Sequence, residues 1–302
     1  MPFRTSARPF DPDHAGASPG PGDALSSTPS LLVPPCVDAV LTSSVETLCE
    51  AAVAATDPLV AEALGSDASG IWWMPSGVHG APGADLERRI GYAYAAALDL
   101  RGGEDALAAL RALQVGGAPA IAAAVAPTAA RMAGRGVADP PWWRQVCGLR
   151  AVRAAEMSGP EDAHRTRIVF IELERRGSRM TLGVLTDATA GGVAVSVSIF
   201  DAFDRVGAAL RNAPAKEPLA GLLRPLPVAE ARHRVLRAIE RTDLLGTADD
   251  HGSGYVAFRG LALRWMAVIG ADLDARPAAP PRTGGGRVSG ARPAAEGDAQ
   301  AA

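Results

Sequence analysis

The chain has 302 residues, of which 48 % are hydrophobic but only 5 % aromatic, so its core must be built mainly from Ala, Val and Leu, which suits closely packed helices. The formal net charge of −3 excludes a global field that would attract nucleic acid or acidic lipid, although a local Arg patch stays open. The three Cys have no CxxC spacing, so we expect reduced thiols. No apolar run approaches the roughly 18 residues of a membrane helix, and no signal-peptide pattern is present. We therefore expect a soluble cytoplasmic protein.

The two ends of the sequence differ from its middle. Residues 1–30 and 276–302 are rich in Pro, Gly and small or polar residues, have no periodicity, and are predicted to be disordered tails. Between them, residues 31–135 have the apolar spacing of helices, whereas residues 136–275 change to strands followed by helices. The sequence therefore predicts a helical region and an α+β region.

Five helices are predicted in the helical region, which is rich in Ala. The first has an apolar face made of Leu41, Val45, Leu48 and Ala52. Asp57 is placed to cap a short second helix that starts at Pro58. The remaining three helices are expected over residues 85–100, 104–113 and 118–133.

The α+β region begins after Pro140 and Pro141, which prevent a helix from continuing. Apolar and polar residues then alternate over residues 168–175, 180–187 and 193–199, with Arg176-Gly177-Ser178 as the first hairpin turn. Three helices are expected after the strands: one capped by Asp201, one starting near Pro227, and one from Tyr255 to Val268. The predicted fold class is α+β, with an Ala-rich helical N-terminal half followed by a three-stranded antiparallel meander covered by helices.

The turn DATAGG between the second and third predicted strands is a candidate ligand site. Its adjacent glycines, Gly191 and Gly192, allow a positive φ and a close approach of the backbone. A nest of backbone N–H groups could hold an anion there, together with Asp187 and with Ser196 and Ser198 on the following strand. A plain hairpin connection needs the same glycines, and the pattern matches neither a P-loop nor a Rossmann fingerprint.

Two pairs of adjacent tryptophans are candidate interaction residues: Trp72 with Trp73, and Trp142 with Trp143. Large aromatic side chains are enriched at the centres of protein interfaces. Neighbouring side chains diverge on any regular element, so we expect one Trp of each pair in the core and the other partly exposed. Packing alone is the alternative role for all four.

Three arginines gather on one side of a predicted amphipathic helix and could contact phosphates: Arg234, Arg237 and Arg241. Glu230 and Glu240 interleave this face, and no aromatic platform accompanies it. A solvated surface is therefore the alternative, and nucleic-acid binding is a minor hypothesis.

The sequence contains no recognisable catalytic or metal-binding signature. Asp249, Asp250 and His251 are adjacent in a Gly-rich loop, but adjacent residues seldom converge on one ion without distant ligands. A nucleophile elbow, a Ser-x-x-Lys motif and an HExxH motif are all missing. We therefore expect neither a metal ion nor a cofactor.

The DATAGG turn and the strand after it resemble a motif of a family of actinobacterial proteins with no assigned activity. In that family an Ala-rich helical half leads through a Pro-Pro-Trp link into a hairpin and then into the motif D-H-N-x-G-G-x-A-K-D. Asp187, Gly191, Gly192 and Ala194 match this motif, whereas its His, Asn, Lys and second Asp are replaced here. The resemblance covers residues 100–270 and implies a non-catalytic relative if those polar residues are functional.

Three functional hypotheses follow from the sequence. The missing catalytic motifs, the Trp pairs and the long tails favour a non-enzymatic accessory or regulatory protein that acts through protein partners. A small-molecule binder or enzyme that uses the turn from Asp187 to Gly192 is the first alternative. A weak nucleic-acid binder that uses the Arg234, Arg237 and Arg241 face is the second, and no hypothesis involves a membrane.

Overall fold

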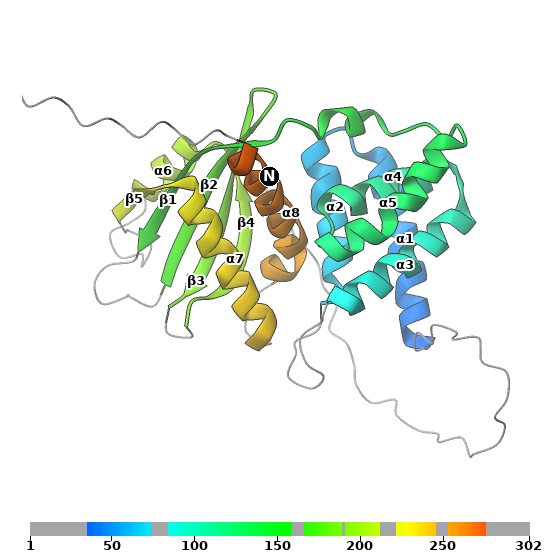
Figure 1. Ribbon diagram of the computed structural model, residues 1–302, viewed down its shortest axis with the longest axis horizontal. Coiled ribbons are helices and arrows are strands. Elements are labelled where there is room, and N and C mark those ends of the chain that lie inside the picture. Colours follow the sequence, from blue (N-terminus) through cyan, green and yellow to red (C-terminus); the bar gives the residue numbers. More distant parts are fainter. Residues whose placement is uncertain are drawn as a thin grey trace, which may run out of the picture. The chain divides into compact units, whose positions relative to one another are not determined.

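The computed structural model describes residues 35–73, 84–158, 166–188, 191–211, 222–245 and 253–275. The chain divides into two units, residues 1–39 and 40–302. Of the first unit, only residues 35–39 are described, and they form the start of the first helix. All other elements belong to the second unit, and the two predicted tails lie outside the described residues. Figure 1 shows the elements in chain order.

The five predicted helices of the helical region are all confirmed. They are α1 (Pro35–Ala54), α2 (Pro58–Gly70), α3 (Ala84–Arg101), α4 (Gly103–Gly116) and α5 (Pro119–Gly134), followed by the short 3-10 helix η1 (Pro141–Gln145). Asp57 caps α2 as predicted, because its side chain accepts a hydrogen bond of 2.7 Å from the Leu59 N–H. Helix α4 is the centre of this region, since residues 106–113 are all buried.

Glycines let α2 and α4 approach each other more closely than larger residues would allow. A Cβ atom added to Gly65 in α2 would lie only 1.9 Å from the carbonyl oxygen of Ala112 in α4. A Cβ added to Gly116 in α4 would lie 1.8 Å from the carbonyl oxygen of Glu62 in α2. The close packing of helices predicted from the Ala- and Gly-rich composition is therefore present at this crossing.

The sheet has five strands, not the three that were predicted. The strands are β1 (Arg150–Ser158), β2 (Thr166–Arg175), β3 (Ser178–Asp187), β4 (Val193–Phe200) and β5 (Leu222–Leu226), in the order β4-β3-β2-β1-β5 with every neighbouring pair antiparallel. The predicted meander corresponds to β2, β3 and β4. Between β2 and β3, Arg176 (φ 49°) and Gly177 (φ 85°) form the expected tight hairpin turn.

The two strands that the sequence did not predict have weak strand signals. The buried residues of β1 include Ala154 and Ala155, which favour helices, and two arginines interrupt its apolar pattern. Strand β5 has five residues and contains Pro225, which lacks a backbone N–H. Such a residue is tolerated at the edge of a sheet, which is where β5 lies.

Helices cover both faces of the sheet. Helices α7 (Val228–Leu245) and α8 (Ser253–Ala275) pack on the face that carries Ile171, Leu182 and Val197. Helix α6 (Phe203–Arg211) packs on the opposite face through Phe203, which meets Phe170 of β2 at a ring-centroid distance of 6.1 Å. Figure 1 shows α7 and α8 on one side of the sheet and α6 on the other. The α+β class and the helical cover are confirmed.

A buried ion pair connects the helical region to the sheet. Arg175, at the end of β2, donates two hydrogen bonds of 2.6 and 3.0 Å to the carboxylate of Glu62 in α2. Both side chains are almost completely buried. Burial raises the pKa of the Glu62 carboxyl, although the guanidinium of Arg175 opposes this effect. The pair therefore fixes the position of α2 against the β2–β3 hairpin.

Candidate functional site

The glycine turn between β3 and β4 has the backbone conformation that the sequence predicts. Gly191 (φ 78°) and Gly192 (φ 83°) both have positive φ. The Gly192 N–H donates a hydrogen bond of 2.8 Å to the carbonyl oxygen of Asp187, and the Gly191 N–H donates one of 3.2 Å to that of Ala188. Both donors are therefore used within the turn. Ligand binding at this turn stays a prediction, and the observed bonding is that of a chain reversal.

The two candidate serines lie on β4 in different surroundings: a Cβ added to Gly254 of α8 would lie 3.0 Å from Ser196 Oγ, whereas Ser198 lies on the face that carries Phe170 and α6. Ser198 is opposite Gly183 in β3, whose missing side chain leaves room for the rings of Phe170 and Phe200. Ser196 and Ser198 are both half-buried. Ala194 was predicted on the same face as these serines but lies in the core that α7 and α8 cover, on the face opposite to Ser198.

A β-bulge explains this change of face. The register of β3 with β4 pairs Leu185 with Ser196 but Thr186 with Ala194, so Val195 is the extra residue. The insertion of one residue reverses the alternation of side chains along β4. Ala194 is then held by α7, because its N–H donates a hydrogen bond of 2.7 Å to Thr242 Oγ1.

The second Trp pair follows the predicted pattern of one core and one partly exposed residue. Trp142 is completely buried and donates a hydrogen bond of 3.1 Å from Nε1 to the carbonyl oxygen of Ala52. Trp143 is half-buried, and the guanidinium carbon of Arg111 lies 4.0 Å from its ring centroid. Both side chains have packing partners, and their role as an interaction surface stays a prediction.

The first Trp pair shows the same division, with Trp73 buried and Trp72 half-buried. Trp72 donates a hydrogen bond of 3.1 Å from Nε1 to the hydroxyl oxygen of Tyr94. Trp73 donates one of 3.2 Å to Asp243 Oδ1 in α7 and packs edge-on against Tyr255, with ring centroids 5.3 Å apart. Trp73 therefore belongs to a polar cluster that was not predicted from the sequence.

The predicted arginine face of α7 is divided by its contacts. Arg234 bonds to Glu156 of β1 and lies 2.5 Å from Glu230 of its own helix. The guanidinium of Arg241 lies beside the glycine turn, so that a Cβ added to Gly192 would be 3.2 Å from Nη1. The structure thus places Arg241 next to the DATAGG turn, while Arg234 is used in ion pairs within the protein.

The polar cluster centred on Asp243, here called the Asp243 cluster, consists of Trp73, Glu87, Asp243, Tyr255 and Arg259. Arg259 donates hydrogen bonds of 2.7 and 2.5 Å to the two carboxylate oxygens of Asp243 and one of 2.7 Å to Glu87. The Tyr255 hydroxyl donates one of 2.9 Å to Asp243 Oδ1. Asp243 therefore accepts hydrogen bonds from three different side chains.

The electrostatics of the Asp243 cluster are those of a stable ion pair. Burial alone would lower the pKa of Arg259, but the hydrogen bonds and charge of Asp243, with the charge of Glu87, raise it. Burial raises the pKa of the Tyr255 hydroxyl, and the negative charge of Asp243 adds to this effect. Arg259 therefore stays charged and Tyr255 stays protonated near neutral pH, so neither is prepared to act as a base.

A sequence signal for this cluster exists in the helical spacing. Asp243 follows Ile239 by four residues and thus continues the buried face of α7. Arg259 follows Tyr255 by four residues on the buried face of α8. A charged residue on the apolar face of a predicted helix indicates a buried partner, because an unpaired buried charge is strongly unfavourable.

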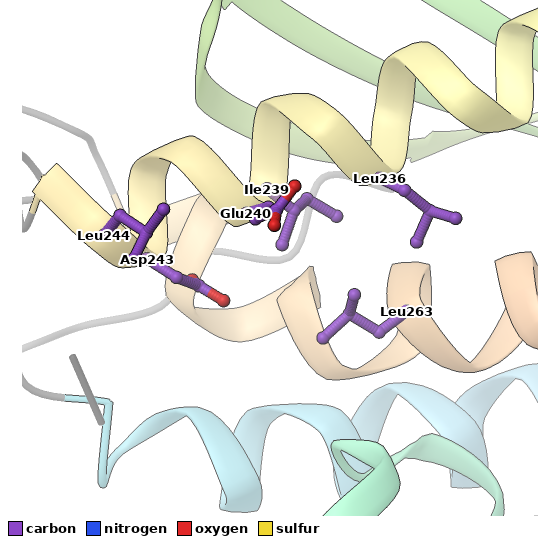
Figure 2. Close-up of a pocket in the computed structure, with 6 residues that line it drawn as sticks. All are labelled: Leu236, Ile239, Glu240, Asp243, Leu244 and Leu263. Atoms are coloured by element: carbon purple, nitrogen blue, oxygen red, sulfur yellow. The ribbon is translucent and has the colours of Figure 1, made fainter. Parts of the chain in front are cut away.

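Beside the Asp243 cluster lies a hollow of about 350 Å³ between α7 and α8, here called the α7–α8 groove. Its lining residues are four apolar ones and two acidic ones: Leu236, Ile239, Leu244, Leu263, Glu240 and Asp243. Figure 2 shows the five α7 residues along one helix, with Leu263 facing them from α8. The groove can accept apolar side chains, and the Glu240 carboxylate can bind a polar or cationic group.

Other kinds of site find little support in the parts of the chain that are described. No group of three or more His, Cys, Asp or Glu side chains there is arranged to hold a metal ion. The loop with Asp249, Asp250 and His251 lies outside the described residues. None of the described helices has both the length and the apolarity to cross a membrane.

No protein-family model matches the chain, and no significant similarity to a curated protein or to a solved structure was found. The fold defines the chain as an α+β protein, with a helical region joined to a five-stranded antiparallel sheet. The functional conclusion therefore rests on the geometry of the molecule itself.

Proposed function

We propose that this protein is a non-enzymatic accessory protein that binds a protein partner through the α7–α8 groove. The observation that carries the proposal is the apolar hollow between two helices, whose rim residue Leu244 is 62 % exposed. Burial of a leucine side chain against a partner contributes roughly 1.5 to 3 kcal/mol. The exposed rim and the apolar floor together resemble the grooves in which proteins anchor a neighbour's side chains.

The chemistry of the groove favours binding over catalysis. Among the described residues that line it, there is no Ser, Cys, His, Lys or Tyr side chain that could act as a nucleophile. One carboxylate, that of Asp243, is already held by Arg259 in an ion pair. Pockets for small molecules measure roughly 300 to 1,000 Å³, so this hollow is at the lower end and suits a few side chains of a larger partner.

The two alternative functions receive less support from the contacts of their residues. For a small-molecule binder or enzyme at the glycine turn, the N–H groups of Gly191 and Gly192 are occupied within the turn. For a nucleic-acid binder, Arg234 is held by Glu156 and Glu230. A phosphate backbone would in addition be repelled by the acidic lining of the nearby groove.

The test combines crosslinking with purified proteins. A photo-crosslinking amino acid placed at Leu244 should form an adduct with a partner in the cells that make this protein, whereas the same probe at Leu245 should not. Leu245 is a matched control, because it is 56 % exposed and is not among the groove-lining residues.

The partner identified in this way is then purified and its affinity measured. Leu244→Ser should weaken binding by about ten-fold, which corresponds to about 1.4 kcal/mol, and Leu245→Ser should leave the affinity unchanged. Equal affinity of the wild type and both variants would show that the groove is not the binding site.

A further inference from the structure

We infer that the segment bound in the α7–α8 groove is a basic amphipathic helix, which inserts apolar side chains between α7 and α8 and places a Lys or Arg against Glu240. This inference rests on the proposed function and names the chemistry of the partner. It follows from three features of the groove: the charge of its lining, the polarity of α7, and the kind of backbone that forms its walls.

The lining of the groove is acidic. Two of its six residues are carboxylic acids, Glu240 and Asp243, and no Arg side chain of α7 or α8 is among them. Asp243 is ion-paired with Arg259, which is almost completely buried and also bonds to Glu87. Glu240 is exposed and forms no ion pair with any of the described residues. The groove therefore presents one uncompensated negative charge to a partner.

The direction of α7 adds to this negative character. The helix ends at Leu245, next to the groove residues Asp243 and Leu244, and its last turn contains no basic residue. The C-terminal end of a helix carries a partial negative charge, which a cation near the last turn stabilises. A Lys or Arg of the partner near Glu240 would interact favourably with both the carboxylate and the helix end.

The walls of the groove favour a helical partner over an extended one. They are the sides of two α-helices, whose backbone N–H and C=O groups are already bonded within each helix. An extended segment would find no backbone partners there, whereas a helix satisfies its own backbone groups. On the edge strand β4, Thr242 of α7 already bonds to the N–H and C=O of Ala194.

The test uses three synthetic helical peptides with the same leucine positions at i, i+3 and i+7. Their polar positions carry Lys in the first peptide, Gln in the second and Glu in the third. Binding of each fluorescein-labelled peptide to the full-length protein is measured by fluorescence anisotropy at low salt. We expect the Lys peptide to bind more tightly than the Gln peptide, and the Glu peptide to bind most weakly.

Substitutions in α7 test whether the charge preference of the peptides arises at the groove. Glu240→Gln should weaken the Lys peptide roughly two- to five-fold, the range of a single exposed ion pair, and should leave the Gln peptide unchanged. The control Glu230→Gln removes an acid of the same helix that lies outside the groove lining and should leave the Lys peptide unchanged. A Lys peptide with Pro at its centre should lose binding, because it no longer forms a continuous helix.

The outcomes separate this inference from the proposed function. If Leu244→Ser weakens the Gln peptide but the Lys peptide binds no better than the Gln peptide, the groove binds a partner and the inferred basic character is wrong. Unchanged binding of the Pro-containing peptide would overturn the helical form of the segment. If no peptide binds, or if Leu244→Ser affects none of them, both the inference and the proposed groove function fail.

Discussion

The close crossing of α2 and α4 predicts a large effect of one added methyl group. In Gly65→Ala the new Cβ would lie 1.9 Å from the carbonyl oxygen of Ala112, whereas real Cβ atoms essentially never lie within 3.0 Å of a heavy atom in a residue distant along the chain. The obstacle is backbone, so α2 and α4 must move apart by about 1 Å along their contact. Overpacking of this kind costs about 1 to 3 kcal/mol, and a backbone obstacle places this site at the upper end.

Helix propensity opposes this loss but does not cancel it. Ala is more favourable than Gly inside a helix by about 1 kcal/mol. The expected net decrease in the free energy of unfolding is therefore about 2 kcal/mol, measured by urea denaturation followed by circular dichroism. The matched control is Gly134→Ala in α5, where an added Cβ meets nothing within 4 Å and stability should stay the same or rise slightly. Equal stability of the two variants would refute the close crossing.

Three further predictions concern stability and thiol chemistry. Thr242→Val leaves the buried Ala194 N–H without its acceptor and should lower the free energy of unfolding by about 1 to 3 kcal/mol in urea, whereas an unchanged midpoint would contradict the bond that holds β4 to α7. Asp243→Asn removes the main counter-charge of the buried Arg259 and should cost about 3 kcal/mol in the same assay; a loss below about 1 kcal/mol would show that the pair is effectively solvated. Burial raises the pKa of the Cys49 thiol to about 11, so that about one molecule in a thousand is thiolate at pH 8. Iodoacetamide at pH 8 should therefore label the exposed Cys147 and spare Cys49, as peptide mass spectrometry would show, and rapid native labelling of Cys49 would contradict its burial.

The sequence predicted those elements whose apolar residues repeat with a clear period. The five helices of the N-terminal region and strands β2, β3 and β4 have such a pattern, and the two residues of the tight turn between β2 and β3, Arg176 and Gly177, are as expected. Strands β1 and β5 lack it, because Ala and Arg weaken the alternation in β1 and Pro225 interrupts the short β5. The place of β5 in the sheet is set by its pairing with the distant strand β1, which no local pattern encodes.

The candidate site was harder to predict than the fold, because its residues come from distant segments. Arg259 and Glu87 are 172 positions apart, and Trp73 and Asp243 are 170 positions apart. The candidate residues predicted from the sequence are instead adjacent pairs, such as Trp72 with Trp73 and Gly191 with Gly192. Local spacing indicates Arg259 as a charge on an apolar helix face, but its partners Asp243 and Glu87 follow only from the packing of α7 and α3 against α8.

Most residues of the groove also contribute to the packing of the protein, and this determines which variants can test function. Asp243 lines the groove and also holds Arg259, Tyr255 and Trp73 in place, so its substitution changes both binding and stability. A partner that binds only the folded chain raises its stability by about 2.7 kcal/mol at a hundredfold excess over Kd. If the partner no longer stabilised Asp243→Asn, the cause could be weaker binding or the lower stability of the variant itself. Glu240 lines the groove and forms no ion pair with any of the described residues. If the partner no longer stabilises Glu240→Gln, this variant has therefore lost binding.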